Sequence, residues 1–219
     1  MAPRLNLEAI ENLPRTFYLH DNFISEGEEE YLLSRVYAAP KPKWTDLRNR
    51  RLQNWGGVPH KDKALLCSEK MPHWLDTIID KVVDTTGLFE GCRPNHVLVN
   101  EYQPGQGILP HTDGPLYTPI VANVSLGSHT VLVISRREDR SVVGKILLKP
   151  RSLLITKDEA YSDYLHGIEE LKEDSLDPTV YAAEPSGDGP TCLPRKTRVS
   201  LTIRHVARVV NVGSAMFRS

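Results

Sequence analysis

The sequence predicts a mainly β fold, a jelly roll or β sandwich that is buttressed by helices near its N-terminus. Before about residue 94 the apolar side chains recur at helical spacing, whereas from residue 95 onward they gather in short runs rich in Val, Ile, Leu and Thr. Glycine and proline punctuate these runs, as in proteins built from several short strands. The 219 residues suit one domain. We therefore expect a single domain over 1–219, with a helical region over about 1–94 and a jelly-roll core over about 95–210.

Two helices are predicted in the N-terminal region. Residues 25–38 begin with Ser25 and carry Glu28 three residues later, which is the pattern of a capping box. Residues 72–86 repeat apolar side chains at helical spacing, and Gly87 follows directly, as is typical of a helix C-terminus. We expect these helices to pack on the β core.

The strands of the core are predicted from apolar, β-rich runs between turn residues. These runs are residues 96–102, 120–126, 129–135, 145–149, 151–157 and 198–206. Residues 158–190 differ from them, because ten acidic side chains stand there against one lysine. We expect the second half of this segment, residues 175–190, to form a polar, solvated loop.

Composition and charge narrow the functional classes. The formal net charge of −1 gives no overall attraction to nucleic acid or to an anionic membrane, so a polyanion must be bound by a local patch. The three cysteines are odd in number and widely spaced, which argues against a disulfide framework or a thiolate zinc site.

No apolar run reaches the roughly 18 residues that span a bilayer, and the first residues carry charges where a secretion signal needs an apolar core. We expect a protein of the cytoplasm and nucleus without membrane association, and we expect it to be a monomer.

The stretch HTDGP, residues 111–115, is the first candidate site. If it lies on a strand, His111 and Asp113 point the same way, because alternate residues share a face. His166, in the short apolar segment DYLHGI, is the candidate for a third ligand. Two histidines and one carboxylate leave open positions on a metal and suit Fe(II) chemistry with oxygen. The alternative is that a histidine and an acid stand two residues apart by chance.

Polar residues at even spacing indicate an anion site. Four of them share one face of the run 198–206: Arg198, Ser200, Thr202 and Arg204. Asn100 and Tyr102 share a face of the run 96–102 in the same way. An arginine fork matches a carboxylate with two parallel hydrogen bonds, so this face is a candidate carboxylate site. The alternative is a half-exposed edge strand whose arginines are solvated.

The stretch 41–57 is the candidate for substrate binding. It carries five basic side chains against Asp46 alone, with two tryptophans between them. Phosphates pair with basic groups and bases stack on aromatic rings, so such a stretch suits single-stranded nucleic acid. The residues that we expect to bind substrate are Trp44, Arg48, Arg50, Arg51 and Trp55. The alternative is a basic surface loop whose tryptophans pack on the core.

Together these pieces resemble the AlkB family of Fe(II)- and 2-oxoglutarate-dependent dioxygenases. The family pattern N-x-Y, H-x-D, distal H and R-x-N-x-x-x-R is matched in order by residues 100–102, 111–113, 166 and 198–204. The resemblance implies a double-stranded β-helix fold, Fe(II) held by His111, Asp113 and His166, and 2-oxoglutarate and O2 as cosubstrates. It implies that 2-oxoglutarate lies against Arg198, Asn100, Tyr102, Ser200, Thr202 and Arg204. Ser200 departs from the pattern, because the family usually has asparagine there.

The resemblance also implies an activity, the oxidative demethylation of N-alkylated bases in nucleic acid, with residues 41–57 as a nucleotide-recognition lid. A base reaches a buried iron only when it is flipped out or already single-stranded, so we expect single-stranded or flipped-base nucleic acid as the partner. Two alternatives stay open: a protein or small-molecule hydroxylase on the same iron core, and a non-catalytic nucleic-acid-binding protein. The acidic segment lengthens the interval between His166 and Arg198, and we expect it to reshape the rim of the site.

Overall fold

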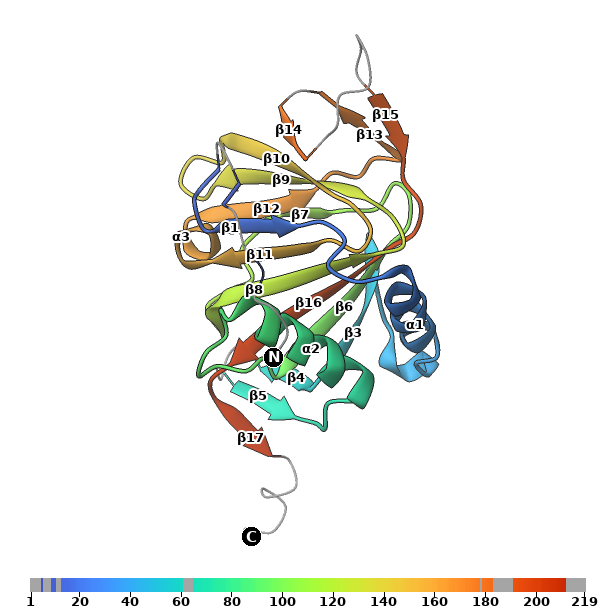
Figure 1. Cartoon of the computed structure of the whole chain (residues 1–219), viewed down its shortest axis with the longest axis vertical. Coiled ribbons are helices and arrows are strands. Elements are labelled where there is room, and N and C mark those ends of the chain that lie inside the picture. Colours follow the sequence, from blue (N-terminus) through green and yellow to red (C-terminus); the bar gives the residue numbers. More distant parts are fainter. Residues whose placement is uncertain are drawn as a thin grey trace.

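The computed structural model describes residues 5, 9–10, 13–60, 65–177, 179–182 and 191–211. Over these residues the chain builds two main β-sheets, with helices on the outer side of the larger one (Figure 1). The larger sheet has the strand order β1-β11-β8-β16-β6-β3-β2, and the smaller one has the order β14-β10-β9-β12-β7. The predicted mainly β architecture, a jelly roll with helices packed against it, is confirmed.

The strands divide between the two main sheets and two small ones. The larger sheet contains β1 (Phe17–His20), β2 (Thr45–Leu47), β3 (Arg50–Trp55), β6 (His96–Tyr102), β8 (Tyr117–Leu126), β11 (Leu153–Lys157) and β16 (Arg198–Val206). The smaller sheet contains β7 (Ile108–His111), β9 (Thr130–Arg136), β10 (Val142–Leu148), β12 (Tyr164–Ile168) and β14 (Val180–Tyr181). The two small sheets contain β4 (Gly57–His60), β5 (Leu65–Ser68) and β17 (Val209–Asn211), and β13 (Glu173–Leu176) and β15 (Thr191–Pro194).

The helices are α1 (Glu26–Tyr37), α2 (His73–Thr86) and the short α3 (Asp158–Ser162), with a 3-10 turn at Lys41–Lys43. The predicted capping box of α1 is present, because the Ser25 hydroxyl accepts from the Glu28 amide and the Glu28 carboxylate accepts from the Ser25 amide. α2 is followed by Gly87, whose φ of 64° is left-handed and suits glycine. Among the described residues, no helix is long and apolar enough to cross a membrane.

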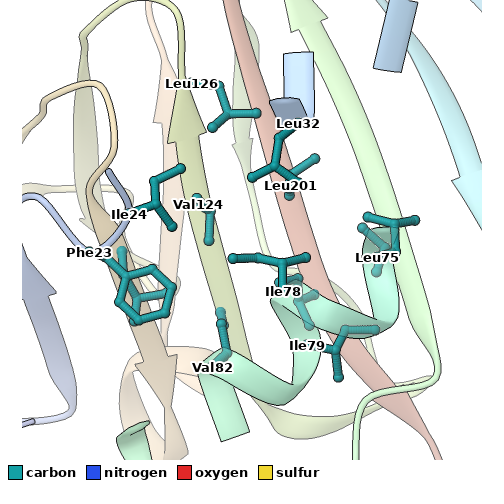
Figure 2. Close-up of a cluster of buried hydrophobic side chains, with 14 of the residues drawn as sticks. Phe23, Ile24, Leu32, Leu75, Ile78, Ile79, Val82, Val124, Leu126 and Leu201 are labelled. Carbon is teal, nitrogen blue, oxygen red and sulfur yellow. The ribbon is translucent and has the colours of Figure 1, made fainter. Parts of the chain in front are cut away.

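One part of the core lies between the two long helices and the larger sheet. Leu75, Ile78 and Val82 of α2 pack with Val124 of β8 and Leu201 of β16 (Figure 2). Each of these side chains is at most 4 % exposed. Because alternate residues of a strand point to opposite faces, the other faces of β8 and β16 are turned toward the smaller sheet. Asn123 of β8 and the even-numbered polar side chains of β16 stand there.

A second part of the core lies between the two main sheets. Leu132 of β9, Leu154 of β11 and Ile168 of β12 belong to this buried cluster, together with Tyr102 of β6. The same four side chains line a cavity between the sheets. The apolar core of the sandwich therefore forms part of the wall of the candidate site.

The N-terminal region carries strands that the sequence analysis does not predict. β1 pairs with β11, and β3 and β2 extend the larger sheet beyond β6. β1 has only four residues and β3 reads RRLQNW, so neither shows an apolar alternation of recognisable length. The β core thus begins before residue 95, while the domain boundaries stay a prediction.

The acidic segment contains regular structure. It includes α3, β12, β13 and β14, and β13 pairs with β15. This hairpin is fixed by Arg195, whose Nη2 lies 2.6 Å from Asp174 Oδ1, and His129 Nε2 lies 3.3 Å from the same carboxylate. The polar-loop prediction for 175–190 is wrong for the strand residues 175–176 and 180–181, and its residues 178 and 183–190 lie outside the described residues.

Candidate active site

A cavity of about 390 Å³ brings the predicted metal and anion sites together between the sheets. The predicted site residues that line it are Arg50, Asn100, Tyr102, His111, Asp113, His166, Arg198, Ser200, Thr202 and Arg204. All four even-spaced side chains of β16 are among them, so the predicted shared face of that strand is confirmed. The other predicted site residues, Trp44, Arg48, Arg51 and Trp55, do not line this cavity.

Strand pairing brings the two candidate histidine ligands together. β12 runs antiparallel to β7, and His166 stands directly opposite His111 in this pairing. The centroids of the two imidazole rings are 4.5 Å apart. Residues that are distant in the sequence thus become neighbours through the smaller sheet.

Asp113 reaches the same place from a turn and not from a strand. β7 ends at His111 and Asp113 lies beyond it, so the strand that would have put the two side chains on one face does not extend to Asp113. The chain turns at Gly114, whose φ of 96° is readily adopted by glycine, and the Tyr161 hydroxyl donates a hydrogen bond to the Gly114 carbonyl oxygen. This turn places the Asp113 Oδ2 atom 3.9 Å from Nε2 of His166.

Further contacts orient the three side chains. His111 Nδ1 lies 2.8 Å from the Leu109 carbonyl oxygen; because a carbonyl only accepts, the ring proton is on Nδ1 and Nε2 is left to a ligand. Arg204 Nη1 lies 2.7 Å from Asp113 Oδ1.

Burial acts to raise the pKa of Asp113, but Arg204 and the two imidazoles hold it below its usual range. Burial lowers the pKa of His166 to about 4. The site thus offers a carboxylate at Asp113 and a neutral imidazole at His166, the forms that bind metals.

This donor set fits Fe(II) in kind, since two imidazoles and one carboxylate leave open coordination positions. Among the described residues, however, no group of three His, Cys, Asp or Glu side chains is close enough to hold a metal ion as it stands. Neighbouring ligands of one ion stand about 3 Å apart when each bond is about 2.1 Å, and the 3.9 Å between Asp113 and His166 is wider than that. The three side chains would close on the ion, and their role as its ligands stays a prediction.

Among the residues that the structure describes, Arg198 is a buried cation without a carboxylate partner. Its side chain lines the cavity, the residue is 4 % exposed, and its Nε has no hydrogen-bond partner among the described residues. Nη2 donates to two neutral groups, the Ser125 hydroxyl at 2.9 Å and the Asn123 amide oxygen at 3.3 Å. Burial lowers the pKa of Arg198 to about 10. A buried cation in this state favours an anionic ligand, which fits the expected carboxylate of 2-oxoglutarate.

Asn123 is a cavity residue that the sequence analysis missed. It lies on β8, lines the cavity, and donates through Nδ2 to the Thr202 hydroxyl at 3.0 Å. The signal for it was an asparagine within the otherwise apolar stretch IVANVSL. An amide in such a run is buried only where it has hydrogen-bond partners.

Arg204 belongs to a buried chain of polar groups that also includes His96 and Asn54. His96 Nδ1 lies 3.5 Å from Arg204 Nη2, and His96 Nε2 lies 3.2 Å from the Asn54 amide oxygen. Burial, with Arg204 beside it, lowers the pKa of His96 to about 3. The sequence analysis passed over His96, although its even spacing from Asn100 places both on one face of β6.

Alternate residues of β3 point to opposite faces of the larger sheet, so the side chains of the predicted substrate-binding stretch are divided between the two faces. Arg50, Leu52 and Asn54 line the cavity, and Arg50 Nε donates to the Asn100 amide oxygen at 3.2 Å. Arg48 is exposed in the turn between β2 and β3. Arg50 is therefore the one predicted substrate-binding residue, among the five, that lines the cavity.

The remaining three candidates lie on the other face of the larger sheet. Arg51 Nε is 2.7 Å from Oε1 of the buried Glu101, and the Arg51 guanidinium stacks 4.1 Å above the Trp44 ring. Trp55 meets Trp74 edge-on, with ring centroids 5.7 Å apart. Both Trp44 and Trp55 pack on the apolar core, as the alternative interpretation of this stretch expects.

The sequence is similar to those of known proteins. The family model described as the 2OG-Fe(II) oxygenase superfamily matches residues 20–204. The chain is 48 % identical to the "Probable RNA/DNA demethylase ALKBH6" of Danio rerio over 217 residues, which cover 93 % of this chain and 91 % of that protein. It is 29 % identical to the "Uncharacterized protein L905" of Acanthamoeba polyphaga mimivirus over 95 % of this chain and 92 % of the relative.

Comparison of the structure with solved structures supports the fold. The structure of OsALKBH1 matches with a TM-score of 0.62 at 15 % sequence identity, over 88 % of this chain and 99 % of the other. A prolyl-4-hydroxylase from Pseudomonas putida matches with a TM-score of 0.52 at 13 % identity, over 88 % of this chain and 93 % of the other. At these identities the two matches bear on the fold alone.

Proposed function

The chain belongs to the 2OG-Fe(II) oxygenase superfamily and, within it, to the AlkB family, and on that premise we propose that it removes N-alkyl groups oxidatively from bases of single-stranded or flipped-out nucleic acid. The protein is an oxidoreductase of the dioxygenase class. Members of this superfamily use Fe(II), 2-oxoglutarate and O2. The proposal concerns the substrate and the residues that serve the reaction.

The proposal rests on Arg198, a buried cation that has no carboxylate partner among the described residues and lies in the same cavity as His111, Asp113 and His166. A cation that lacks a carboxylate partner is suited to the carboxylate of 2-oxoglutarate. The imidazoles and the carboxylate of the other three residues are suited to Fe(II). One cavity thus holds side chains that are suited to the metal and to the cosubstrate that the reaction needs.

In the proposed mechanism His111, Asp113 and His166 would hold Fe(II), and Arg198 would bind the distal carboxylate of 2-oxoglutarate. When bound, Fe(II) with 2-oxoglutarate and O2 supplies the oxidation of a C–H bond next to a base nitrogen, with release of succinate and CO2. The hydroxylated N-methyl group then leaves as formaldehyde, and the nitrogen of the base takes up a proton. Arg204 keeps one oxygen of Asp113 in place throughout, so that the other faces the metal position.

The substrate is proposed from one relative and from the rim of the cavity. The zebrafish relative carries the name of an RNA/DNA demethylase. Arg50 extends into the cavity from β3, and Val58 of β4, which also lines it, is 53 % exposed. A guanidinium can bind a phosphate or stack on a base, and an exposed apolar side chain can pack against one, so this rim suits a nucleotide.

The test is a turnover assay on methylated oligonucleotides. We expect the protein, with Fe(II), 2-oxoglutarate and O2, to release formaldehyde from N-methylated single-stranded RNA or DNA, and the unmethylated base to appear by mass spectrometry. His111→Ala serves as the inactive control. Conversion of 2-oxoglutarate to succinate that depends on a peptide or a small molecule, with every oligonucleotide unchanged, would favour the hydroxylase alternative and overturn the proposal.

A nucleic-acid substrate also supports a location in the cytoplasm and nucleus, and we propose the monomer as the working form. Fractionation of cells that express the full chain tests the location. Sedimentation of the purified chain tests the monomer.

A further inference from the structure

We propose that Asn123 on β8 is a cosubstrate-binding residue, whose carboxamide binds the same carboxylate of 2-oxoglutarate as Arg198. The proposal rests on 2-oxoglutarate as cosubstrate and does not depend on the nature of the oxidised substrate. Asn123 lies outside the family pattern, which this chain matches at residues 100–102, 111–113, 166 and 198–204.

The position of Asn123 is set by strand register. β8 pairs with β16 so that Asn123 stands opposite Thr202 and Ser125 stands opposite Ser200. Arg198, on the same face of β16, extends its guanidinium to both β8 side chains, with Nη2 at 3.3 Å from Asn123 Oδ1 and 2.9 Å from Ser125 Oγ. Two neighbouring strands therefore contribute to one polar corner of the cavity.

The hydrogen bonds of Asn123 leave it a donor for a ligand. Its oxygen accepts from Arg198, and its nitrogen donates to the Thr202 hydroxyl at 3.0 Å. An amide nitrogen carries two hydrogens, and the contacts of Asn123 with the described residues use one of them, on a residue that lines the cavity and is only partly buried. Asn123 thus has an N–H for a ligand and adjoins a cation that has no acidic partner in the described part of the chain.

A carboxylate is the ligand that this corner recognises. Arg198 supplies the positive charge, and its Nε has no partner among the described residues. A carboxylate has two oxygens and about four acceptor positions, so it can accept from the guanidinium fork and from the amide together. Hydrogen bonds of this charge-assisted kind are stronger than those between neutral groups.

Asn123 also accounts for the departure at position 200. The family pattern has an asparagine there, whereas this chain has Ser200, whose side chain is shorter and carries no amide. Ser200 and Thr202 both line the cavity, and Asn123 is hydrogen-bonded to Thr202 from the neighbouring strand. The amide that position 200 lacks is present in the same corner, on β8.

The test uses Asn123→Asp, which keeps the size of the side chain and places a carboxylate against Arg198. Two opposite changes are expected. The melting temperature of the protein without ligands rises, because the buried cation gains a partner. The affinity for 2-oxoglutarate falls by about ten-fold or more, because that partner occupies the anion site. 2-Oxoglutarate binding is read from the ligand-induced rise in melting temperature, without oxygen and without turnover. Asn123→Ala, which only removes the amide, is expected to weaken 2-oxoglutarate binding without raising the melting temperature.

Asn54→Asp is the matched control, because it adds the same charge to the same cavity but contacts His96 and not Arg198. We expect it to weaken 2-oxoglutarate binding less than Asn123→Asp does. Wild-type affinity in Asn123→Asp and Asn123→Ala, or an equal loss in Asn54→Asp, would overturn the proposal. Because no oligonucleotide is used, these outcomes are separate from success or failure of the demethylase proposal.

Discussion

The carboxylate of Asp113 and the guanidinium of Arg204 form a buried ion pair, with Oδ1 and Nη1 2.7 Å apart and side chains 8 % and 6 % exposed. The pair fixes one oxygen of Asp113 and leaves the other, Oδ2, on the side of His166. Arg204 also stacks on the ring of Tyr117 at 4.0 Å. The orientation of a predicted metal ligand thus depends on a residue of β16.

Loss of Arg204 is expected to destabilise the fold. In Arg204→Met the carboxylate of Asp113 stays buried without its partner, which costs about 3–5 kcal/mol in comparable cases. Unfolding in urea measures the change in free energy. The control is Arg93→Met, because Arg93 pairs with Asp76 and Asp80 while its own side chain is 48 % exposed, and exposed pairs contribute about 1 kcal/mol or less. Equal costs for the two variants would contradict the account of the buried pair.

His96 is expected to make stability depend on pH on the acid side. Its pKa is about 3 in the folded protein and about 6.5 when unfolded, so between these values the unfolded chain binds the additional proton. Stability therefore rises with pH through this window, by at most about 1.4 kcal/mol per pH unit for one group. In His96→Phe the slope of unfolding free energy against pH decreases, and His166, with its lowered pKa of about 4, accounts for part of the remainder. An unchanged slope in this variant would show that His96 is protonated in the folded state.

Arg195 is expected to stabilise the β13–β15 hairpin. Burial acts to raise the pKa of Asp174, but Arg195 and His129 hold it at about 2, so the stabilisation is present above about pH 3.8 and is lost as the pH falls through about 2. In Arg195→Met the buried Asp174 carboxylate loses its guanidinium partner and keeps only the His129 ring, and we expect a lower melting temperature at pH 7 together with faster proteolysis within residues 173–177. Arg137→Met is the control, because Arg137 is exposed and its guanidinium bonds only to the Ser162 carbonyl oxygen among the described residues. A melting temperature in Arg195→Met equal to that of the control would contradict this role.

Arg50 and Arg51 are adjacent but are expected to act differently. Arg50 lines the cavity, whereas Arg51 pairs with Glu101 on the opposite face of the sheet. Arg50→Ala is expected to raise KM for a methylated oligonucleotide and to reduce the salt dependence of its binding. Arg51→Ala is expected to lower stability and to leave KM unchanged. The reverse result would place the substrate on the outer face, beside Trp44.

The elements that the sequence predicted well are those with a strong local pattern. The helices at 26–37 and 73–86 and the strand at 198–206 are found within a residue or two of their expected positions. β7 and β12 were missed as strands, because ILPH and YLHGI are too short for a period to show. It is their pairing that sets His111 against His166, and no local signal contains that information.

The candidate site was predictable where its residues belong to a recognised pattern. Arg198 to Arg204 followed from even spacing on one strand, whereas Asn123 and His96 take part through contacts between strands. Trp55 does not line the cavity, because which face of β3 meets the cavity depends on the pairing of β3 with β6. Trp44 lies before β2, packs on the core and stacks with Arg51. The pairing of strands therefore determines which of these side chains face the cavity, and the local sequence does not contain that information.

The proposed function requires that the HTDGP turn, His166 and Arg198 form one working iron and cosubstrate site. The most direct measurement is an oxygen-free titration of the protein with Fe(II) and 2-oxoglutarate, followed by the visible metal-to-ligand charge-transfer band. We predict a band in the wild type, its loss in His111→Ala, and a weaker band in Arg198→Ala at the same 2-oxoglutarate concentration. A folded wild-type protein that shows no band would contradict the claim.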